Sequence, residues 1–350
     1  MRDGFGREID YMRISVIDSC NLNCYYCNPC DNNEHCHALN ILSVKEVLCI
    51  VRAATRLGIK HFRLTGGEPL LHPQLDEMVL QIKKIPGVSS VSLTTNAVLL
   101  AQHAKWLKEA GIDSINVSLD TIDASEYERI TKKPLLEEVK HGINAAIECG
   151  IRVKINVVLT PQTDVVALTR YVAKKGTDIR FIEMMPVGEG HTNGVEPYKK
   201  VIGTLSKLYG EPCRINTEKT KEINSGNDKR KIPDNGPAEY YIFPELGIRV
   251  GLIQAIHGKF CDTCNRIRVT ADGRLMPCLG SNVTMDLVPA SCDNTDDVEN
   301  DLVIAQALGA AIEAKPRCHN FNDNTVAYTK ATETKAAEVN AARNMSRIGG

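Results

Sequence analysis

Three closely spaced cysteines near the start of the chain could together hold a metal centre. Cys20, Cys24 and Cys27 leave three residues and then two between neighbours. This uneven spacing, with Asn, Pro and two adjacent Tyr around it, disfavours a regular helix, so the thiolates can point inward from one loop. On a four-iron cluster, three thiolates leave one iron open to a small chelating molecule. The alternative on spacing alone is a zinc site closed by a fourth ligand from the following loop, namely Cys30, His35, Cys36 or His37.

A second group of three cysteines, Cys261, Cys264 and Cys278, lies far along the chain. A C-x2-C pair followed by a distant cysteine across a glycine turn fits an iron–sulfur cluster and a zinc ribbon equally, with His257 or Cys292 as the fourth zinc ligand. Between these cysteines, Arg266 and Arg268 alternate on a strand-like run and therefore face one side. Arginine presents a planar fork suited to phosphate oxygens, but from the residues alone a solvated strand face is the favoured interpretation of this pair.

Composition limits the classes of function. With 350 residues, 43% of them hydrophobic, the chain can form one large α/β domain and a smaller appendage. A net charge of -1 provides no general basic field, so neither nucleic acid nor an anionic membrane is an expected partner. No apolar run approaches the roughly 20 residues of a membrane span, and the charged N-terminus does not resemble a signal peptide. We expect a cytoplasmic protein, where thirteen cysteines indicate metal or redox chemistry rather than disulfides.

Strand-like apolar runs alternate with helical patterns through the first half of the chain. The clearest helix begins with a capping box of Ser43 and Glu46 and ends at Gly58. This alternation predicts six β/α units. Their strands are expected at residues 11–17, 61–65, 91–94, 114–119, 152–159 and 179–184.

Polar residues follow nearly every predicted strand. An open doubly wound sheet would gather its functional groups at one switch point, whereas a barrel collects them from the carboxyl ends of all strands. The distribution therefore favours an α/β fold with a partial (β/α)6 TIM-type barrel, two units short of a full one. The polar groups are the cysteine loop, residues 65–69, Thr95, Asn96, Ser118, Asp120, Asn156 and Glu183.

The composition changes along the chain and predicts four regions. Residues 1–190 form the barrel, and residues 191–237 form a polar connection in which the β/α rhythm stops. Residues 238–290 carry the second cysteine group and are expected to cover the barrel opening. Residues 291–350 are a tail that ends in Gly349 and Gly350, with no recognisable core pattern.

The first cysteine loop and the glycine motif resemble those of radical S-adenosylmethionine enzymes. Tyr26 stands just before the last cysteine of the C-x3-C-x2-C loop, and Gly66-Gly67-Glu68-Pro69 follows the next strand. The resemblance implies a cluster that reduces S-adenosylmethionine by one electron and so starts hydrogen abstraction from a substrate. It also implies that the cofactor is bound by Tyr26, Gly67, Glu68, Thr95, Asn96, Ser118 and Asn156.

The second cysteine group, residues 180–188 and the Gly-Gly end narrow the resemblance to the GTP 3',8-cyclase family of molybdenum cofactor biosynthesis. This resemblance implies two [4Fe-4S] clusters, one on each cysteine group. Gly349 and Gly350 would reach into the active site and act there with Arg266 and Arg268. The resemblance assigns GTP binding to Arg13, Arg63, Lys154, Arg180, Arg266 and Arg268.

The resemblance also implies a flavodoxin- or ferredoxin-like electron donor, a downstream pterin synthase and compatibility with a homodimer. His61 and His72 stand where basic residues are common in the family, which predicts a pH-sensitive phosphate site. Two alternatives remain from the residues themselves. One is a radical enzyme that modifies a peptide, and the other is a zinc-bound regulatory or scaffold protein.

Overall fold

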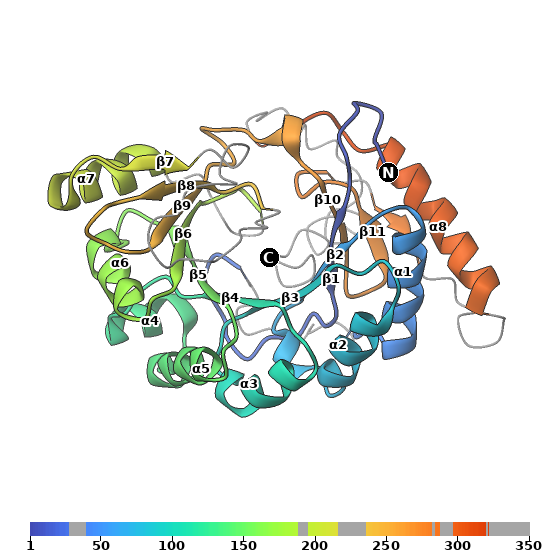
Figure 1. The fold of residues 1–350 in the computed structure, drawn as a ribbon, viewed down its shortest axis with the longest axis horizontal. Helices are drawn as coiled ribbons and strands as arrows, with labels where there is room; N and C mark the ends of the chain where they lie inside the picture. The colour runs from blue at the N-terminus through green and yellow to red at the C-terminus, as the bar shows by residue number, and fades with distance from the viewer. Residues whose placement is uncertain are drawn as a thin grey trace, which may run out of the picture.

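A 12-stranded sheet curves through the computed structural model, which describes residues 1–27, 40–187, 195–215, 236–281, 284–287, 297–319 and 321. Its strand order is β12-β11-β10-β1-β2-β3-β4-β5-β6-β9-β8-β7. The eight strands from β10 to β9 run parallel, and the sheet bends into an open barrel with helices on its outer side (Figure 1).

The six predicted β/α units are confirmed. The strands are β1 (Tyr11–Ser15), β2 (His61–Thr65), β3 (Ser90–Thr95), β4 (Ser114–Ser118), β5 (Val153–Leu159) and β6 (Asp178–Glu183). The outer helices are α1 (Val44–Arg56), α2 (Leu75–Lys84), α3 (Leu100–Glu109), α4 (Ala124–Thr131), α5 (Leu136–Glu148) and α6 (Val165–Lys174). At the start of α1 the Ser43 hydroxyl accepts from the Glu46 amide, and the Glu46 carboxylate accepts from the Ser43 amide, as the capping box predicted.

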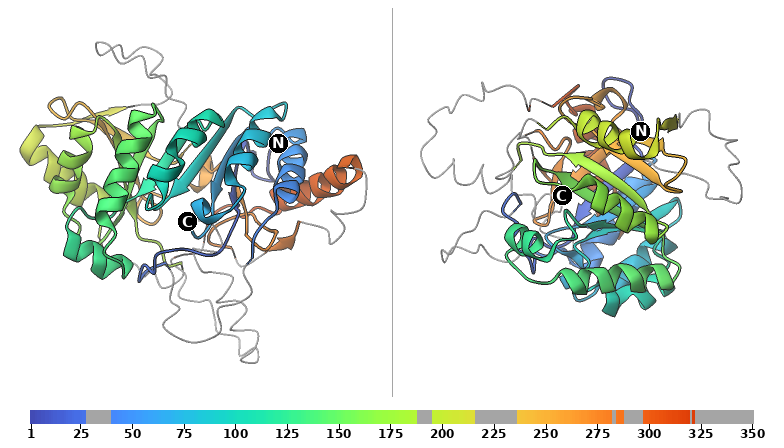
Figure 2. Two further views of the ribbon diagram at one scale, coloured as in Figure 1. Left: turned by 90° about the horizontal axis from the view of Figure 1, so that it is seen from below. Right: turned by 90° about the vertical axis from the view of Figure 1, so that its left-hand side faces the viewer.

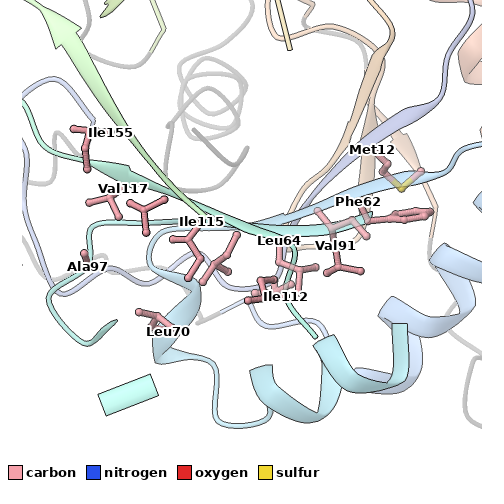
Figure 3. Close-up of a cluster of buried hydrophobic side chains, with 14 of the residues drawn as sticks. Met12, Phe62, Leu64, Leu70, Val91, Ala97, Ile112, Ile115, Val117 and Ile155 are labelled. Carbon is pink, nitrogen blue, oxygen red and sulfur yellow. The ribbon is translucent and has the colours of Figure 1, made fainter. Parts of the chain in front are cut away.

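Alternation along the strands separates the hydrophobic core from the barrel interior. Met12, Ile14, Phe62 and Leu64 are fully buried members of the core. Met12, Phe62 and Leu64 lie on the outer face of the strands, towards the helices (Figure 3). Because side chains in a strand point alternately to the two faces, the residues between them point inward. The inward residues are mostly polar or charged, so the barrel contains a polar cavity while its apolar core lies between sheet and helices.

Two strands from the second half of the chain occupy the free edges of the barrel. β9 (Arg249–Ile253) pairs with β6, and β10 (Arg266–Val269) pairs with β1, both in parallel. They stand where two further β/α units would lie, but without their own outer helices between them. Residues 254–265, which include Cys261 and Cys264, cross the gap between β9 and β10. The outer antiparallel strands are β7 (Cys213–Ile215), β8 (Glu239–Ile242), β11 (Arg274–Met276) and β12 (Met285–Asp286).

The C-terminal region contains a core helix that the sequence pattern did not predict. Helix α8 (Asp297–Glu313) packs against α1 and buries Ile304 and Leu308 (Figures 1 and 2). The buried Asp301 carboxylate accepts from Arg52 of α1 at 2.9 Å, which joins the two helices by an ion pair. No core pattern is recognisable in the sequence of residues 291–350, and α8 is nonetheless part of the hydrophobic core.

The remaining short elements lie in loops. The expected polar connection contains the π-helical turn η2 (Tyr198–Ile202) and helix α7 (Gly203–Tyr209), so regular structure continues beyond the last barrel strand. The 3-10 turns are η1 (Pro69–Leu71) and η3 (Cys261–Thr263). None of the described helices has both the length and the apolar character needed to cross a bilayer.

Candidate active site

One cavity of about 770 Å³ occupies the barrel interior and brings both cysteine groups together. Gly349, Gly350 and the loop cysteines and histidines at 30, 35, 36, 37 and 292 lie outside the described residues. Among the described residues that the resemblance assigns to the cofactor, the substrate or a cluster, all but Glu68 line this cavity. They are Arg13, Cys20, Cys24, Tyr26, Cys27, Arg63, Gly67, Thr95, Asn96, Ser118, Lys154, Asn156, Arg180, Cys261, Cys264, Arg266, Arg268 and Cys278.

The glycine pair packs directly against the start of the first cysteine loop. A Cβ at Gly66 would lie 2.3 Å from the Ile17 carbonyl oxygen, and one at Gly67 would lie 2.1 Å from that of Ser19. This closeness allows the Gly67 amide to donate to Ile17 at 2.7 Å and the Glu68 amide to donate to Ser19 at 2.8 Å. The absence of side chains therefore positions the loop that carries Cys20.

Glu68 links the glycine motif to the end of β3. Its carboxylate is fully buried and accepts from the Thr95 hydroxyl at 2.7 Å, the Asn96 amide at 2.7 Å and the Leu70 amide at 3.0 Å. Burial raises the pKa of Glu68 to about 7, although these three donors favour the charged form. The Asn96 side chain continues the chain of contacts by donating to Asn21, next to Cys20, at 2.7 Å. Glu68 thus lies behind the cavity wall and stabilises the two segments in front of it.

The first cysteines fit a cationic metal centre. Burial raises the pKa of Cys20 to about 11 and, together with the neighbouring Cys20 thiolate, that of Cys27 to about 12. Burial also raises the pKa of Cys24 strongly, and Cys27 adds to the effect. Three adjacent thiolates are therefore unfavourable in this pocket unless positive charge binds them, and metal coordination supplies it because a coordinating thiol is deprotonated.

Asp120, which follows β4, holds Tyr26 of the cysteine loop. Its carboxylate accepts from the Tyr26 hydroxyl and from the Val158 amide, the latter at 2.7 Å. Burial raises the pKa of Asp120 to about 6, since these donors offset only part of the desolvation. The sequence placed Asp120 among the polar groups at strand ends but did not predict this contact, which joins residues 94 positions apart.

The barrel interior contains a belt of cations. Arg13 pairs in register with Arg63 on one side and with Arg268 on the other, which places all three on the inner face. Burial, and to a smaller extent the charge of Arg268, lowers the pKa of Arg13. Burial, and to a smaller extent the charge of Arg266, lowers the pKa of Arg268 to about 10. Mutual repulsion in a desolvated cavity would be relieved by a bound polyanion.

On the opposite side of the belt, β5 and β6 contribute Lys154 and Arg180. Arg180 donates to the Asn156 side chain at 2.9 Å. A Cβ at Gly251 of β9 would lie 2.8 Å from the Arg180 side chain, so this glycine provides the space that Arg180 occupies. Strand β9, which takes the place of a missing barrel unit, therefore leaves room for the Arg180 side chain.

The second cysteine group faces the same cavity from the gap between β9 and β10. Burial alone would raise the pKa of Cys264, but the charges of Arg266 and Lys315 outweigh it and lower the pKa. Lys315 also lines the cavity and was not predicted, because nothing in its local sequence marks it. Glu183 at the end of β6 accepts from the Ile256 amide at 2.7 Å and contacts the His257 ring, which anchors the loop before Cys261.

The two unusual histidines have different surroundings. His61 lines the cavity, with its Nδ1 2.8 Å from the Ser90 hydroxyl. The His72 ring instead contacts the Leu42 carbonyl at 2.9 Å and accepts from the Gln74 amide at 3.1 Å, and it is not part of the cavity wall. Of the two, His61 alone is placed for the pH-sensitive phosphate contact that the sequence suggested.

The partial barrel, its cysteine loop and the adjoining glycine motif define a radical S-adenosylmethionine enzyme, which has an iron–sulfur cluster and binds S-adenosylmethionine. The radical SAM superfamily model matches residues 14–167, and the model described as Molybdenum Cofactor Synthesis C matches residues 177–321. The GTP 3',8-cyclase of Clostridium perfringens (strain SM101 / Type A) is 35% identical over 324 residues, covering 92% of this chain and 95% of that protein. That of Alkaliphilus oremlandii is 35% identical over 357 residues, covering both chains completely. The chain belongs to the GTP 3',8-cyclase family.

A solved structure supports the fold independently. The crystal structure of Streptococcus suis SuiB bound to S-adenosylmethionine is similar, with a TM-score of 0.56 and 15% sequence identity. The match covers 82% of this chain and 65% of that protein. At this identity the similarity concerns the arrangement of the backbone.

Proposed function

We propose that this chain converts GTP to (8S)-3',8-cyclo-7,8-dihydroguanosine 5'-triphosphate, the first step of molybdenum cofactor biosynthesis. Family membership supports the reaction. The observation that carries the proposal is the single cavity lined by both cysteine groups and by buried cations. A nucleoside triphosphate needs fixed positive charge for its phosphates and a second anchoring point for its base, and this cavity offers groups suited to each.

The assignments for the first half of the site come from the family resemblance and are supported by the position of these residues in the cavity. Cys20, Cys24 and Cys27 would hold the first [4Fe-4S] cluster. When bound, the cluster and S-adenosylmethionine supply the radical chemistry that starts the reaction. The chain orients the cofactor and excludes water. The residues proposed to hold it are Tyr26, Gly67, Thr95, Asn96, Ser118 and Asn156, which line the cavity, together with Glu68, which supports Thr95 and Asn96 from behind the wall.

For the second half of the site, Cys261, Cys264 and Cys278 would hold a second [4Fe-4S] cluster with an open iron for the substrate. Arg13, Arg63, Lys154 and Arg180 would bind the triphosphate. Arg266 and Arg268, on the strand that follows Cys264, would bind and orient GTP between that cluster and the first one. Gly349 and Gly350 would complete the site, since small residues can enter a crowded cavity.

Anaerobic incubation with GTP, S-adenosylmethionine and dithionite tests the reaction. We expect 5'-deoxyadenosine and a cyclised nucleotide in matched amounts. Replacing Cys24 by Ala should abolish both products, whereas replacing the exposed Cys213 of β7, which belongs to neither cysteine group, should change neither. The absence of both products from the iron-loaded parent protein would refute the proposal.

Two measurements separate the alternatives. Deleting Gly349 and Gly350 should abolish cyclisation while S-adenosylmethionine cleavage continues. A parent protein that cleaves S-adenosylmethionine but forms no cyclised nucleotide would favour a peptide-modifying enzyme. Metal analysis of anaerobically purified protein should find iron and sulfide. Zinc without either would favour a regulatory or scaffold protein.

The reaction also predicts partners. The first cluster needs one electron per radical event, so a flavodoxin- or ferredoxin-like donor is proposed, and a pterin synthase would consume the product. Reduction by a flavodoxin of this class can be followed by the absorbance of the cluster. A homodimer is the proposed assembly, and analytical ultracentrifugation of the iron-loaded protein tests it.

A further inference from the structure

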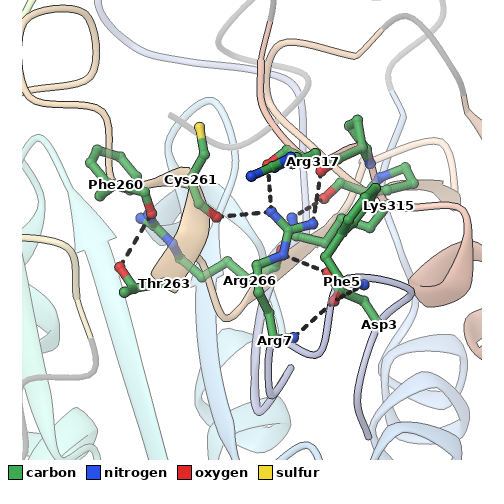
Figure 4. A network of polar contacts seen from close by, with 11 residues as sticks. Asp3, Phe5, Arg7, Phe260, Cys261, Thr263, Arg266, Lys315 and Arg317 are labelled. Atoms are coloured by element: carbon green, nitrogen blue, oxygen red, sulfur yellow. Dashed lines mark hydrogen bonds and ion pairs between the residues drawn. The ribbon is translucent and has the colours of Figure 1, made fainter.

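Two buried cations from opposite ends of the chain, Arg7 and Lys315, hold the backbone on both sides of the second cysteine group (Figure 4). We infer that they are positioning residues that set the spacing of the three cysteines at 261, 264 and 278 for a metal cluster. This inference rests on the second cluster of the proposed function. The experiment below separates failure of that cluster from failure of the inference.

Lys315 bridges the open end of the hairpin formed by β10 and β11. The strand pairing includes Arg268 with Met276 and does not extend further towards the cysteines. Beyond that pair, the Lys315 ammonium donates to the Arg266 carbonyl at 2.8 Å and to the Pro277 carbonyl at 2.6 Å. The ammonium therefore takes the place of the next pair of backbone hydrogen bonds between the two strands. The Arg266 carbonyl is two residues from Cys264, and Pro277 precedes Cys278, so the ammonium sets the separation of these two cysteines.

Arg7 fixes the remaining cysteine, Cys261, to the segment that follows Lys315. Its Nε donates to the buried Asp3 carboxylate at 2.6 Å, which leaves both Nη groups directed elsewhere. Nη1 donates to the carbonyl oxygens of Cys261 and Arg317, each at 2.8 Å, and Nη2 donates to that of Pro316 at 2.7 Å. The planar guanidinium thus holds Cys261 and residues 316–317 in one fixed relation.

Together the contacts tie all three cysteines to residues 315–317, which follow α8. The loop that crosses the gap between β9 and β10 has no outer helix of its own between these strands. Its geometry must therefore come from elsewhere, and the two cations supply it from the chain's beginning and from the segment after α8. Helix α8 packs against α1 and contacts β11, and this packing places Lys315 next to the hairpin.

The charge of Lys315 has a physical reason. Its side chain is only 2% exposed, and a buried ammonium is costly compared with an apolar side chain of similar length. Two carbonyl oxygens satisfy part of its hydrogen-bonding capacity. A group of three thiolates holding a cluster is negatively charged, so a cation beside it recovers part of the desolvation cost.

The test uses full-length variants in which only one cysteine group can hold iron. In the Cys20→Ala, Cys24→Ala, Cys27→Ala background, reconstituted protein should contain about four iron atoms per chain, all in the second cluster. Adding Lys315→Met should reduce the iron content per chain at least twofold and broaden the electron paramagnetic resonance signal of the reduced cluster. In the complementary background that lacks the other three cysteines, Lys315→Met should leave the first cluster's iron unchanged.

A matched control is Lys108→Met. Lys108 also donates to a backbone carbonyl, that of Gly150 at 2.7 Å, but on the exposed side of the barrel. We expect full iron content in that variant. Should Lys315→Met prove insoluble, Arg7→Lys gives the same test, because it keeps the charge and loses the planar fork; its iron in the second cluster should also fall at least twofold.

Each outcome decides one point. Full iron and an unchanged signal in Lys315→Met would overturn the inference and leave the proposed function intact. Equal loss of iron from both clusters would also overturn it, since that indicates a general loss of folding. If the first background holds no iron even with Lys315 present, the second cluster and the inference fail together.

Discussion

Gly67→Ala tests whether the glycine motif positions the first cysteine loop. The new Cβ would lie 2.1 Å from the Ser19 carbonyl oxygen and 2.5 Å from its carbonyl carbon, both of them backbone atoms. Folded proteins do not show such contacts, so the loop must move by about an ångström. That movement would break the hydrogen bonds from Gly67 to Ile17 and from Glu68 to Ser19.

The cost can be worked from these contacts. Two backbone hydrogen bonds contribute about 1 kcal/mol each, and forcing an extra methyl group into a packed site costs about 1–3 kcal/mol. The total of about 3–5 kcal/mol falls on the segment next to Cys20. Since about 1.4 kcal/mol corresponds to a factor of ten, the competent loop geometry should become at least 100-fold less populated relative to its alternatives.

Iron analysis and 5'-deoxyadenosine formation measure the consequence. We expect Gly67→Ala to lose the iron of the first cluster and at least 90% of S-adenosylmethionine cleavage. The control is Gly203→Ala in α7, where a Cβ meets nothing within 4 Å and φ is -61°. That variant should match the parent protein or gain up to about 1 kcal/mol of stability. Full iron and normal cleavage in Gly67→Ala would refute the positioning role.

Further predictions concern pH, the core and the substrate. Because the pKa of Asp120 is raised to about 6 from 3.8, the folded state binds its proton more tightly, so the free energy of unfolding should fall by up to about 3 kcal/mol between pH 4 and 6. Urea unfolding of the cluster-free protein should show this fall, and the Asp120→Asn variant should not. An equal change of the unfolding free energy with pH in both proteins would contradict the prediction. Arg249→Met leaves its buried partner Asp178 unpaired and should cost about 3–5 kcal/mol in the same assay, most of which Asp178→Asn should restore; no recovery in the double variant would count against the pair. Arg268→Met should weaken anaerobic GTP binding about 10- to 100-fold and leave GTP-independent S-adenosylmethionine cleavage intact, whereas unchanged affinity would exclude a phosphate contact.

The local parts of the fold were predictable because short-range patterns specify them. Strands β1, β2 and β4 alternate apolar and polar residues, and the Ser43 capping box marks the start of α1. The same alternation predicted that Arg266 and Arg268 face one side of their strand. For these residues the pleat of one strand is enough to decide the face.

Residues that act through distant partners could not be predicted in this way. Glu68 accepts hydrogen bonds from three donors behind the cavity wall, two of them from Thr95 and Asn96 at the end of the next strand. Lys315 and Arg7 have no local pattern that distinguishes them from surface cations. Their role depends on carbonyl groups 38 to 310 residues away, which become neighbours only in the folded chain.

The sequence by itself determined the chemistry available to this protein: two sets of three cysteines, a glycine motif and a series of strand-borne cations. Residue type and spacing within one element are enough for that. The tertiary structure decided that both sets line one cavity, because β9 and β10 take opposite edges of the barrel and carry the second set across its gap. It also decided that the glycines serve the cysteine loop, since only the folded chain brings Gly67 against Ser19.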